Sequence, residues 1–255
     1  MPVWHHHMGL MAIKKLAGRS LLVLALLFGL WVGGYHAYRA IAFEIYKQQA
    51  RANDASGQYR LGLRYLERGS RADVERAIAQ FKAALRNGHP KGRAGLGRAY
   101  RAMGLVVYKQ AVREQDLKIA KIAADWFRRA ASQGNANGML HLASLHAKGE
   151  GVPKDLRKTV SLLRQSARLG NGWALYSLYT YQRLGQAGFS KDPVLAFMWL
   201  YLAAHRSDAS RHAKKVFVED PERERRKLSE AQVAKAMQMS HAWRRRYKRA
   251  GERGP

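Results

Sequence analysis

The sequence predicts an all-α protein: an α-solenoid of about four helix-hairpin repeats with a C-terminal capping helix, preceded by one N-terminal transmembrane helix. Three observations support this prediction. An uncharged apolar run near the N-terminus is long enough to cross a bilayer, similar segments recur at a period of roughly 36 residues, and runs alternating at period two are scarce. A hydrophobic content of 47% is enough to bury a core.

Residues 20–38 form the predicted transmembrane helix. They contain no Asp, Glu, Lys or Arg, and at about 1.5 Å per residue they reach roughly 28 Å. A buried helix of a soluble protein usually carries a polar stripe, which this leucine-rich run lacks. A short basic tail, residues 1–19, precedes it, and the spacing fits an uncleaved anchor better than a cleaved signal. We expect a single-pass protein of the bacterial inner membrane with periplasmic repeats.

The remainder of the chain contains an internal repeat. Four segments align with one another, at intervals of 46, 36 and 37 residues: 80–88, 126–134, 162–170 and 199–207. Each is preceded by a second aligned block, so the repeat has two helical halves. This pattern is typical of stacked helix hairpins.

Residue types within the repeat indicate its packing. Small residues such as Gly62 and Gly97 let neighbouring helices approach closely, and large residues fill the gaps between layers. We expect a ladder of buried side chains along the second helices, formed by Phe81, Trp126, Leu162 and Trp199.

Helix ends are marked by capping residues. Asp155 and Asp192 occupy N-cap positions, and Pro193 falls at the first helical position. The second helices end at glycines, where a left-handed residue is commonly needed: Gly88, Gly134 and Gly170.

At these residues the chain resembles the Sel-one-like repeat family, a relative of the tetratricopeptide repeats. The pattern includes Leu61-Gly62 with Tyr65 and is most complete in the loop over residues 149–155; the resemblance covers roughly residues 55–206. The chain departs from it in a shortened loop at Gly69-Ser70, about ten extra residues around Leu105 to Gln115, and Tyr179 in place of a glycine. The resemblance implies an adaptor or scaffold, often in bacterial envelope assemblies, and implies no catalytic residues.

The segments around the repeats complete the predicted organisation. Residues 39–54 are a linker or helical extension, residues 207–227 a charged connection, and residues 228–255 a capping helix with a basic tail. Ser229 and Gln232 have the spacing of a capping box. The apolar stripe of this helix should cover the open end of the last repeat: Met239, Trp243 and Tyr247.

Sequence motifs of catalysis are missing. The chain has no cysteine, no phosphate-binding glycine loop, no HExxH and no GxSxG elbow. His141 and His146 lie five residues apart, which places them on different faces of a helix, so we interpret them as core histidines. We expect neither an enzyme nor a bound cofactor or metal.

Charge is the remaining signal. The formal net charge is +28. Residues 1–38 hold only three basic residues and no acidic one, so 43 basic and 18 acidic residues, a charge of +25, belong to the rest. We expect protein partners with an acidic surface, such as subunits of a membrane complex. The alternatives are an anionic ligand, nucleic acid or lipid, and a merely solvated basic surface. The candidate binding residues are Arg93, Arg98, Arg101, Arg244, Arg245, Arg246, Lys248 and Arg249.

Overall fold

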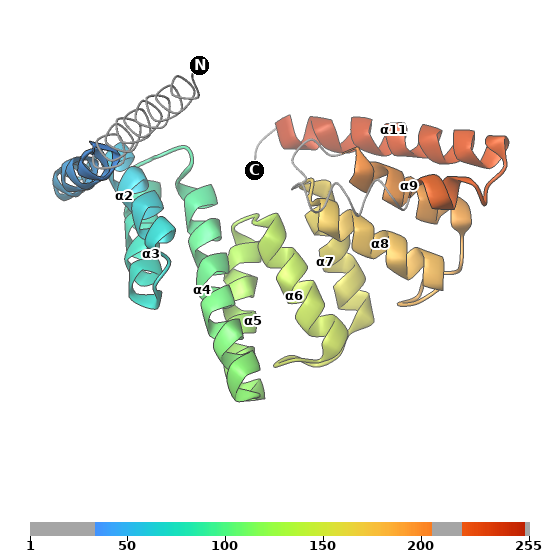
Figure 1. Cartoon of the computed structure of the whole chain (residues 1–255), viewed down its shortest axis with the longest axis horizontal. Coiled ribbons are helices and arrows are strands. Elements are labelled where there is room, and N and C mark those ends of the chain that lie inside the picture. The colour runs from blue at the N-terminus through green and yellow to red at the C-terminus, as the bar shows by residue number, and fades with distance from the viewer. Residues whose placement is uncertain (1–33, 206–220, 253–255) are drawn as a thin grey trace, which may run out of the picture.

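The computed structural model of the chain describes residues 34–205 and 221–252, and in these ranges the regular structure is helical throughout (Figure 1). Each repeat contributes two consecutive helices. The first helices are α2 (Ala55–Arg68), α4 (Gly92–Glu114), α6 (Ala136–Lys148) and α8 (Gly172–Leu184). The second helices are α3 (Arg71–Arg86), α5 (Leu117–Ser132), α7 (Leu156–Arg168) and α9 (Pro193–Ala204).

The helices pack in chain order, each against the next, which is the arrangement of a solenoid. The first helices of consecutive repeats also contact each other, α2 with α4 and α4 with α6. At the far end α11 (Glu230–Glu252) packs against α9 and covers the last repeat. The predicted capping helix is therefore present, and its capping box forms: the Ser229 N–H donates to Gln232 and the Gln232 N–H donates to Ser229.

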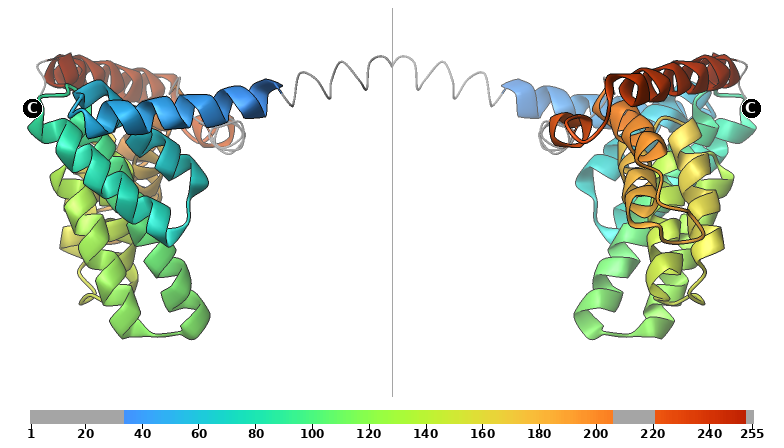
Figure 2. Two further views of the ribbon diagram at one scale, coloured as in Figure 1. Left: turned by 90° about the vertical axis from the view of Figure 1, so that its left-hand side faces the viewer. Right: turned by 90° about the vertical axis from the view of Figure 1, so that its right-hand side faces the viewer.

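Residues 34–51 form a helix that precedes the repeats and packs on α2. Phe43 meets the edge of Tyr65 at 5.6 Å between ring centroids, and Arg39 pairs with Glu67 at 2.7 Å. Figure 2 shows its N-terminal end projecting beyond the body of the repeats. No helix of the described part of the chain is long and apolar enough to cross a membrane. The predicted transmembrane segment, residues 20–38, lies outside the described residues apart from 34–38.

Capping chemistry sets the helix boundaries as predicted. Asp155 and Asp192 accept hydrogen bonds from the N–H groups of Lys158 and Leu195 at the starts of α7 and α9. The glycines that follow three of the second helices have the left-handed backbone the prediction required, with φ of +76°, +76° and +87° at Gly88, Gly134 and Gly170. In the last two cases the next residue is an asparagine that caps the following first helix, a signal that the sequence analysis missed.

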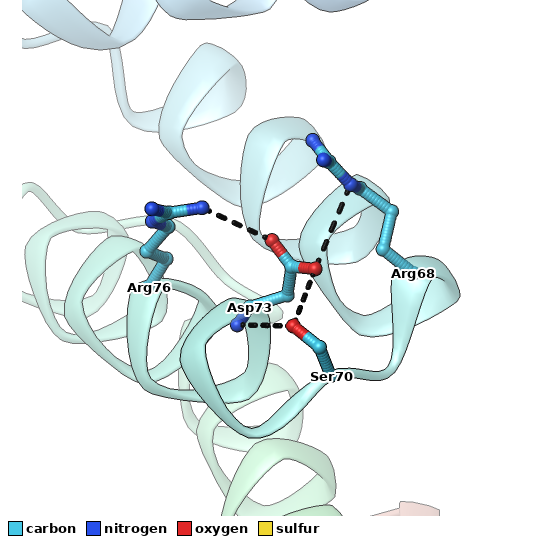
Figure 3. A network of polar contacts seen from close by, with 4 residues as sticks. All are labelled: Arg68, Ser70, Asp73 and Arg76. Atoms are coloured by element: carbon cyan, nitrogen blue, oxygen red, sulfur yellow. Dashed lines mark hydrogen bonds and ion pairs between the residues drawn. The ribbon is translucent and has the colours of Figure 1, made fainter.

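The shortened loop between α2 and α3 is held by a polar network around Asp73 (Figure 3). The Asp73 N–H donates to the Ser70 hydroxyl at 3.0 Å, and this hydroxyl donates back to the Asp73 carboxylate at 2.7 Å. Arg68 and Arg76 lie 3.6 Å and 3.3 Å from the same carboxylate. The Ser70 hydrogen bond and the two guanidinium charges lower the pKa of Asp73, against the opposing effect of burial.

The buried ladder exists, but its members differ from those predicted. The residues at the core positions of the four second helices are Phe81, Phe127, Leu163 and Leu200, all at most 3% exposed. Leu162 is also buried, whereas Trp126 and Trp199 are only partly buried and lie at the margin of the core. The prediction combined two adjacent positions of the helix. Consecutive residues of a helix point about 100° apart, so only one of the two can face the centre of the core.

Glycines make room for the aromatic members of this ladder. A Cβ atom added at Gly62 of α2 would lie 2.9 Å from the Phe81 ring, and one added at Gly95 of α4 would lie even closer to it. Both distances are too short for a real Cβ atom. A Cβ at Gly104 would lie 2.6 Å from the ring of Phe127. Because α4 carries the extra residues of the second repeat, it is 23 residues long. Its extension reaches the next loop, where the Tyr108 hydroxyl donates to Glu150 at 2.6 Å.

Candidate interaction surfaces

The predicted basic residues of the first two repeats lie on α4. Arg93 and Arg98 are exposed and Arg101 is half-buried. Among the described residues none of these arginines has a carboxylate partner within ion-pair distance. Burial and, secondarily, the charge of Arg98 lower the pKa of Arg101, as expected for a cation without a nearby anion.

Five arginines of the preceding helices differ from these, because they do have acidic partners: Arg39, Arg64, Arg68, Arg71 and Arg76. No acidic residue occurs in the chain between Glu75 and Glu114, so the surface of α4 is basic by composition. A second acid-free stretch runs from Asp155 to Asp192. These two acid-free stretches can be seen in the sequence, but the total net charge does not reveal them.

The two histidines of α6 have different environments. His141 stacks on Phe127, with ring centroids 4.9 Å apart, and burial together with the charge of Arg101 lowers its pKa to about 4. It is therefore neutral at physiological pH. His146 is half-buried and its Nδ1 atom lies 3.1 Å from the Pro153 carbonyl, so it supports the loop after α6. In the described ranges no cluster of three or more potential metal ligands occurs.

The predicted basic residues of the C-terminal helix that the structure describes differ in exposure. Arg244 is half-buried, with its guanidinium 5.8 Å from the centre of the Tyr201 ring and its Nη2 atom buried. Arg245 and Arg246 are exposed. The side chains of Lys248 and Arg249 lie outside the description. Arg244 therefore packs against α9, which separates it from the exposed arginines that follow it.

Sequence reasoning missed a pocket between α7, α9 and α11. Its volume is about 250 Å³ and its lining residues are Arg164, Arg168, Trp199, Trp243 and Tyr247. The two arginines are exposed and the three aromatic side chains are half-buried. The spacing of Trp243 and Tyr247 was interpreted as a stripe that only covers the last repeat. In the structure this stripe also forms one wall of the pocket.

The helix pairs and their packing in chain order define an α-solenoid of the helix-hairpin class. The chain belongs to the Sel1 repeat family, whose model matches residues 55–89, 98–135, 136–171 and 180–208, more than half of the chain. This confirms the family that the sequence resemblance indicated. Sel1 repeat proteins generally mediate protein–protein interactions.

The chain is similar to solved structures. One is the crystal structure of c5321, a protective antigen present in uropathogenic Escherichia coli strains that displays an SLR fold; its TM-score is 0.58 at 24% identity, covering 80% of this chain and 41% of that chain. This chain thus spans well under two thirds of that protein. Another is a Sel1 repeat protein from Oxalobacter formigenes, with a TM-score of 0.44 at 23% identity, covering 67% of this chain and 78% of that chain. No curated protein matches the sequence.

Proposed function

We propose that this chain is a membrane-anchored scaffold that holds an acidic protein partner within a bacterial envelope assembly, such as secretion, motility or surface-polymer machinery. The observation that carries the proposal is the basic surface of α4, where Arg93, Arg98 and Arg101 lie on a repeat scaffold without acidic partners in the described residues. Uncompensated surface charge raises the rate of encounter with a protein of opposite charge and disfavours basic partners.

The anchor is the apolar segment 20–38. The helix that continues from it exposes Tyr38, Ile41 and Ile45, which are 64%, 62% and 46% exposed, on a face that the described repeats leave uncovered. Tyrosine is enriched where helices pass from lipid to water. A lipid interface next to the anchor would cover this face.

Carbonate extraction of native membranes tests the anchor. We expect the full chain to stay in the membrane pellet and a variant lacking residues 1–33 to appear in the supernatant, since that deletion removes most of the apolar run and keeps the helix over 34–51. Release of the full chain by carbonate would contradict the proposal.

Purification of the full chain from its native membrane, followed by identification of the co-purifying proteins, tests the scaffold. The decisive comparison uses Arg93→Gln/Arg98→Gln and a control of equal charge on other helices, Arg71→Gln/Arg128→Gln, whose arginines already have acidic neighbours. We expect the first variant to bind the recovered partner more slowly, by about tenfold at low salt, because local uncompensated charge steers association. Equal effects of the two variants would contradict a specific role for the α4 surface.

Nucleic acid or anionic lipid is the alternative ligand. A ligand of this kind would bind with an affinity that falls steeply as salt rises, whatever the nucleotide sequence or acyl chain. The same two variants, tested on an oligothymidylate and on phosphatidylglycerol vesicles, separate this alternative from a protein partner.

A further inference from the structure

The pocket between α7, α9 and α11 combines aromatic walls with two cationic side chains. Trp199 of α9 meets Trp243 of α11 edge to face, with ring centroids 6.1 Å apart. Trp243 in turn lies 4.7 Å from Tyr247, one helical turn further along α11. These contacts hold the three rings in fixed positions around the pocket.

The arginines are also held by aromatic rings. The Arg168 guanidinium lies 5.3 Å from the centre of the Tyr247 ring, and that of Arg164 lies 5.4 Å from the centre of the Phe189 ring. A guanidinium stacked on a ring keeps the N–H donors at its edge free for other hydrogen bonds. The contact with the ring also restricts the arginine side chain before a ligand binds, so less side-chain entropy is lost on binding.

No anion in the described part of the chain uses these donors. Neither Arg164 nor Arg168 has an ion pair or a side-chain hydrogen bond there, no acidic residue lines the pocket, and the sequence of α7 contains none. The pocket therefore presents positive charge beside apolar surface. A planar carboxylate matches the fork of donors on a guanidinium and can accept two parallel hydrogen bonds from it.

The volume limits the ligand further. About 250 Å³ is below the roughly 300–1,000 Å³ of pockets that take drug-sized molecules or cofactors. One or two side chains of a peptide fit this scale. Tryptophan, tyrosine and arginine are also the residues that contribute most to binding energy at protein interfaces.

We infer that this pocket binds a peptide through a carboxylate that lies next to an aromatic side chain, with Arg164 and Arg168 binding the carboxylate and Trp199, Trp243 and Tyr247 packing on the ring. The inference rests on the proposed function as a protein scaffold and specifies which feature of the partner the last repeat recognises. The site depends on the capping helix, because two of its three aromatic side chains belong to α11.

A minimal probe tests the pocket without knowledge of the partner. N-acetylphenylalanine carries a carboxylate beside an aromatic ring, and N-acetylphenylalaninamide is the same molecule without the charge. We expect the acid to shift the indole N–H resonances of Trp199 and Trp243 in the full chain in detergent micelles. The amide should bind at least about tenfold more weakly, because it lacks the charge-assisted hydrogen bonds.

Matched variants locate the binding. Arg164→Gln/Arg168→Gln should weaken binding of the acid by about tenfold or more. Arg157→Gln/Lys158→Gln removes the same charge from exposed positions of the same helix and should change it less than about twofold. Helicity by circular dichroism should be equal in all three proteins, since every substituted residue is exposed.

Three results would overturn the inference: equal affinity for acid and amide, an equal loss in both variants, or arginine-dependent binding of inorganic phosphate or phosphatidylglycerol vesicles that is tighter than binding of the acid. The scaffold proposal does not depend on this test, because co-purification identifies a partner whether or not the probe binds. Conversely, binding of the acid without any co-purifying protein would support the pocket and contradict the scaffold.

Discussion

His141 shows how one side chain acquires its chemistry from a neighbouring repeat. The ring belongs to α6, it stacks on Phe127 of α5, and Arg101 of α4 supplies the nearby positive charge. Burial disfavours the imidazolium form, and the arginine disfavours it further. His141 thus couples the stability of these two repeats to pH.

The stability of the chain should fall when the pH falls below neutrality, partly through His141. Its pKa is about 4 in the folded chain and about 6.5 when unfolded. Between these values the unfolded state binds the proton and the folded state does not, so stability is fully present above the unfolded value and is lost as pH falls toward the folded one. This group accounts for a loss of at most about 3 kcal/mol.

A His141→Phe variant isolates this contribution, since it keeps an aromatic ring against Phe127 and removes the proton. Denaturant unfolding of both proteins at pH 7.5 and pH 4.5 provides the measurement. We expect the variant to gain stability relative to the parent at the lower pH. Parallel changes in the two proteins would show that His141 is not the titrating group.

At the scale of elements, the ladder of second-helix side chains holds the repeats together. Phe127 of α5 is 1% exposed and contacts α4, where Gly104 leaves space for its ring. The adjacent Trp126 is partly exposed. Its ring centroid lies 5.8 Å from that of Tyr100, and the Arg129 guanidinium lies over its ring, 4.6 Å from the centroid. The two residues therefore differ in burial although they are neighbours in sequence.

Alanine substitutions should reveal this difference. Phe127→Ala should cost about 3 to 5 kcal/mol of the free energy of unfolding, because it leaves a cavity at the α4–α5 contact. Trp126→Ala should cost only about 1 to 2 kcal/mol, since its side chain is only partly buried at the margin of the core. Denaturant midpoints followed by circular dichroism give both values, and a larger loss at Trp126 would mean that the ladder has been assigned to the wrong residues.

Capping residues and glycines made the helix boundaries predictable, because their chemistry acts within a few residues. Asp155, Asp192 and Gly134 each fix a helix end locally. The choice between Trp126 and Phe127 depends instead on Gly104, which lies on another helix. The pocket could not be predicted from the sequence for the same reason, because its side chains come from three helices spread from Arg164 to Tyr247.

At the scale of the whole molecule, the distribution of charge matters more than its total. The acid-free stretches at 76–113 and 156–191 lie in different repeats, and the exposed Arg245 and Arg246 lie on the capping helix. A partner that spans the solenoid would meet positive charge at several places. Such charges steer association over distances of about a Debye length, roughly 8 to 10 Å in physiological salt.

Neutralising the C-terminal basic residues tests whether these positive charges steer association. The variant Arg245→Gln/Arg246→Gln/Lys248→Gln/Arg249→Gln omits Arg244, whose guanidinium packs on Tyr201 and whose loss would disturb the contact with α9. With an acidic protein partner, we expect association to slow by about tenfold at low salt and dissociation to change little, because these charges act mainly before contact. The dependence of the association rate on salt should weaken as well.

A control with the same loss of charge carries glutamine at four arginines that already have acidic partners: Arg39, Arg64, Arg71 and Arg128. If the C-terminal residues act locally, the control should slow association less than the variant does. If they instead anchor the chain to lipid or nucleic acid, the variant should lose that binding altogether. Identical rates for the parent and the variant at two ionic strengths would remove Arg245, Arg246, Lys248 and Arg249 from the interaction surface. The α4 surface and the pocket arginines, Arg164 and Arg168, would then be the basic sites that remain.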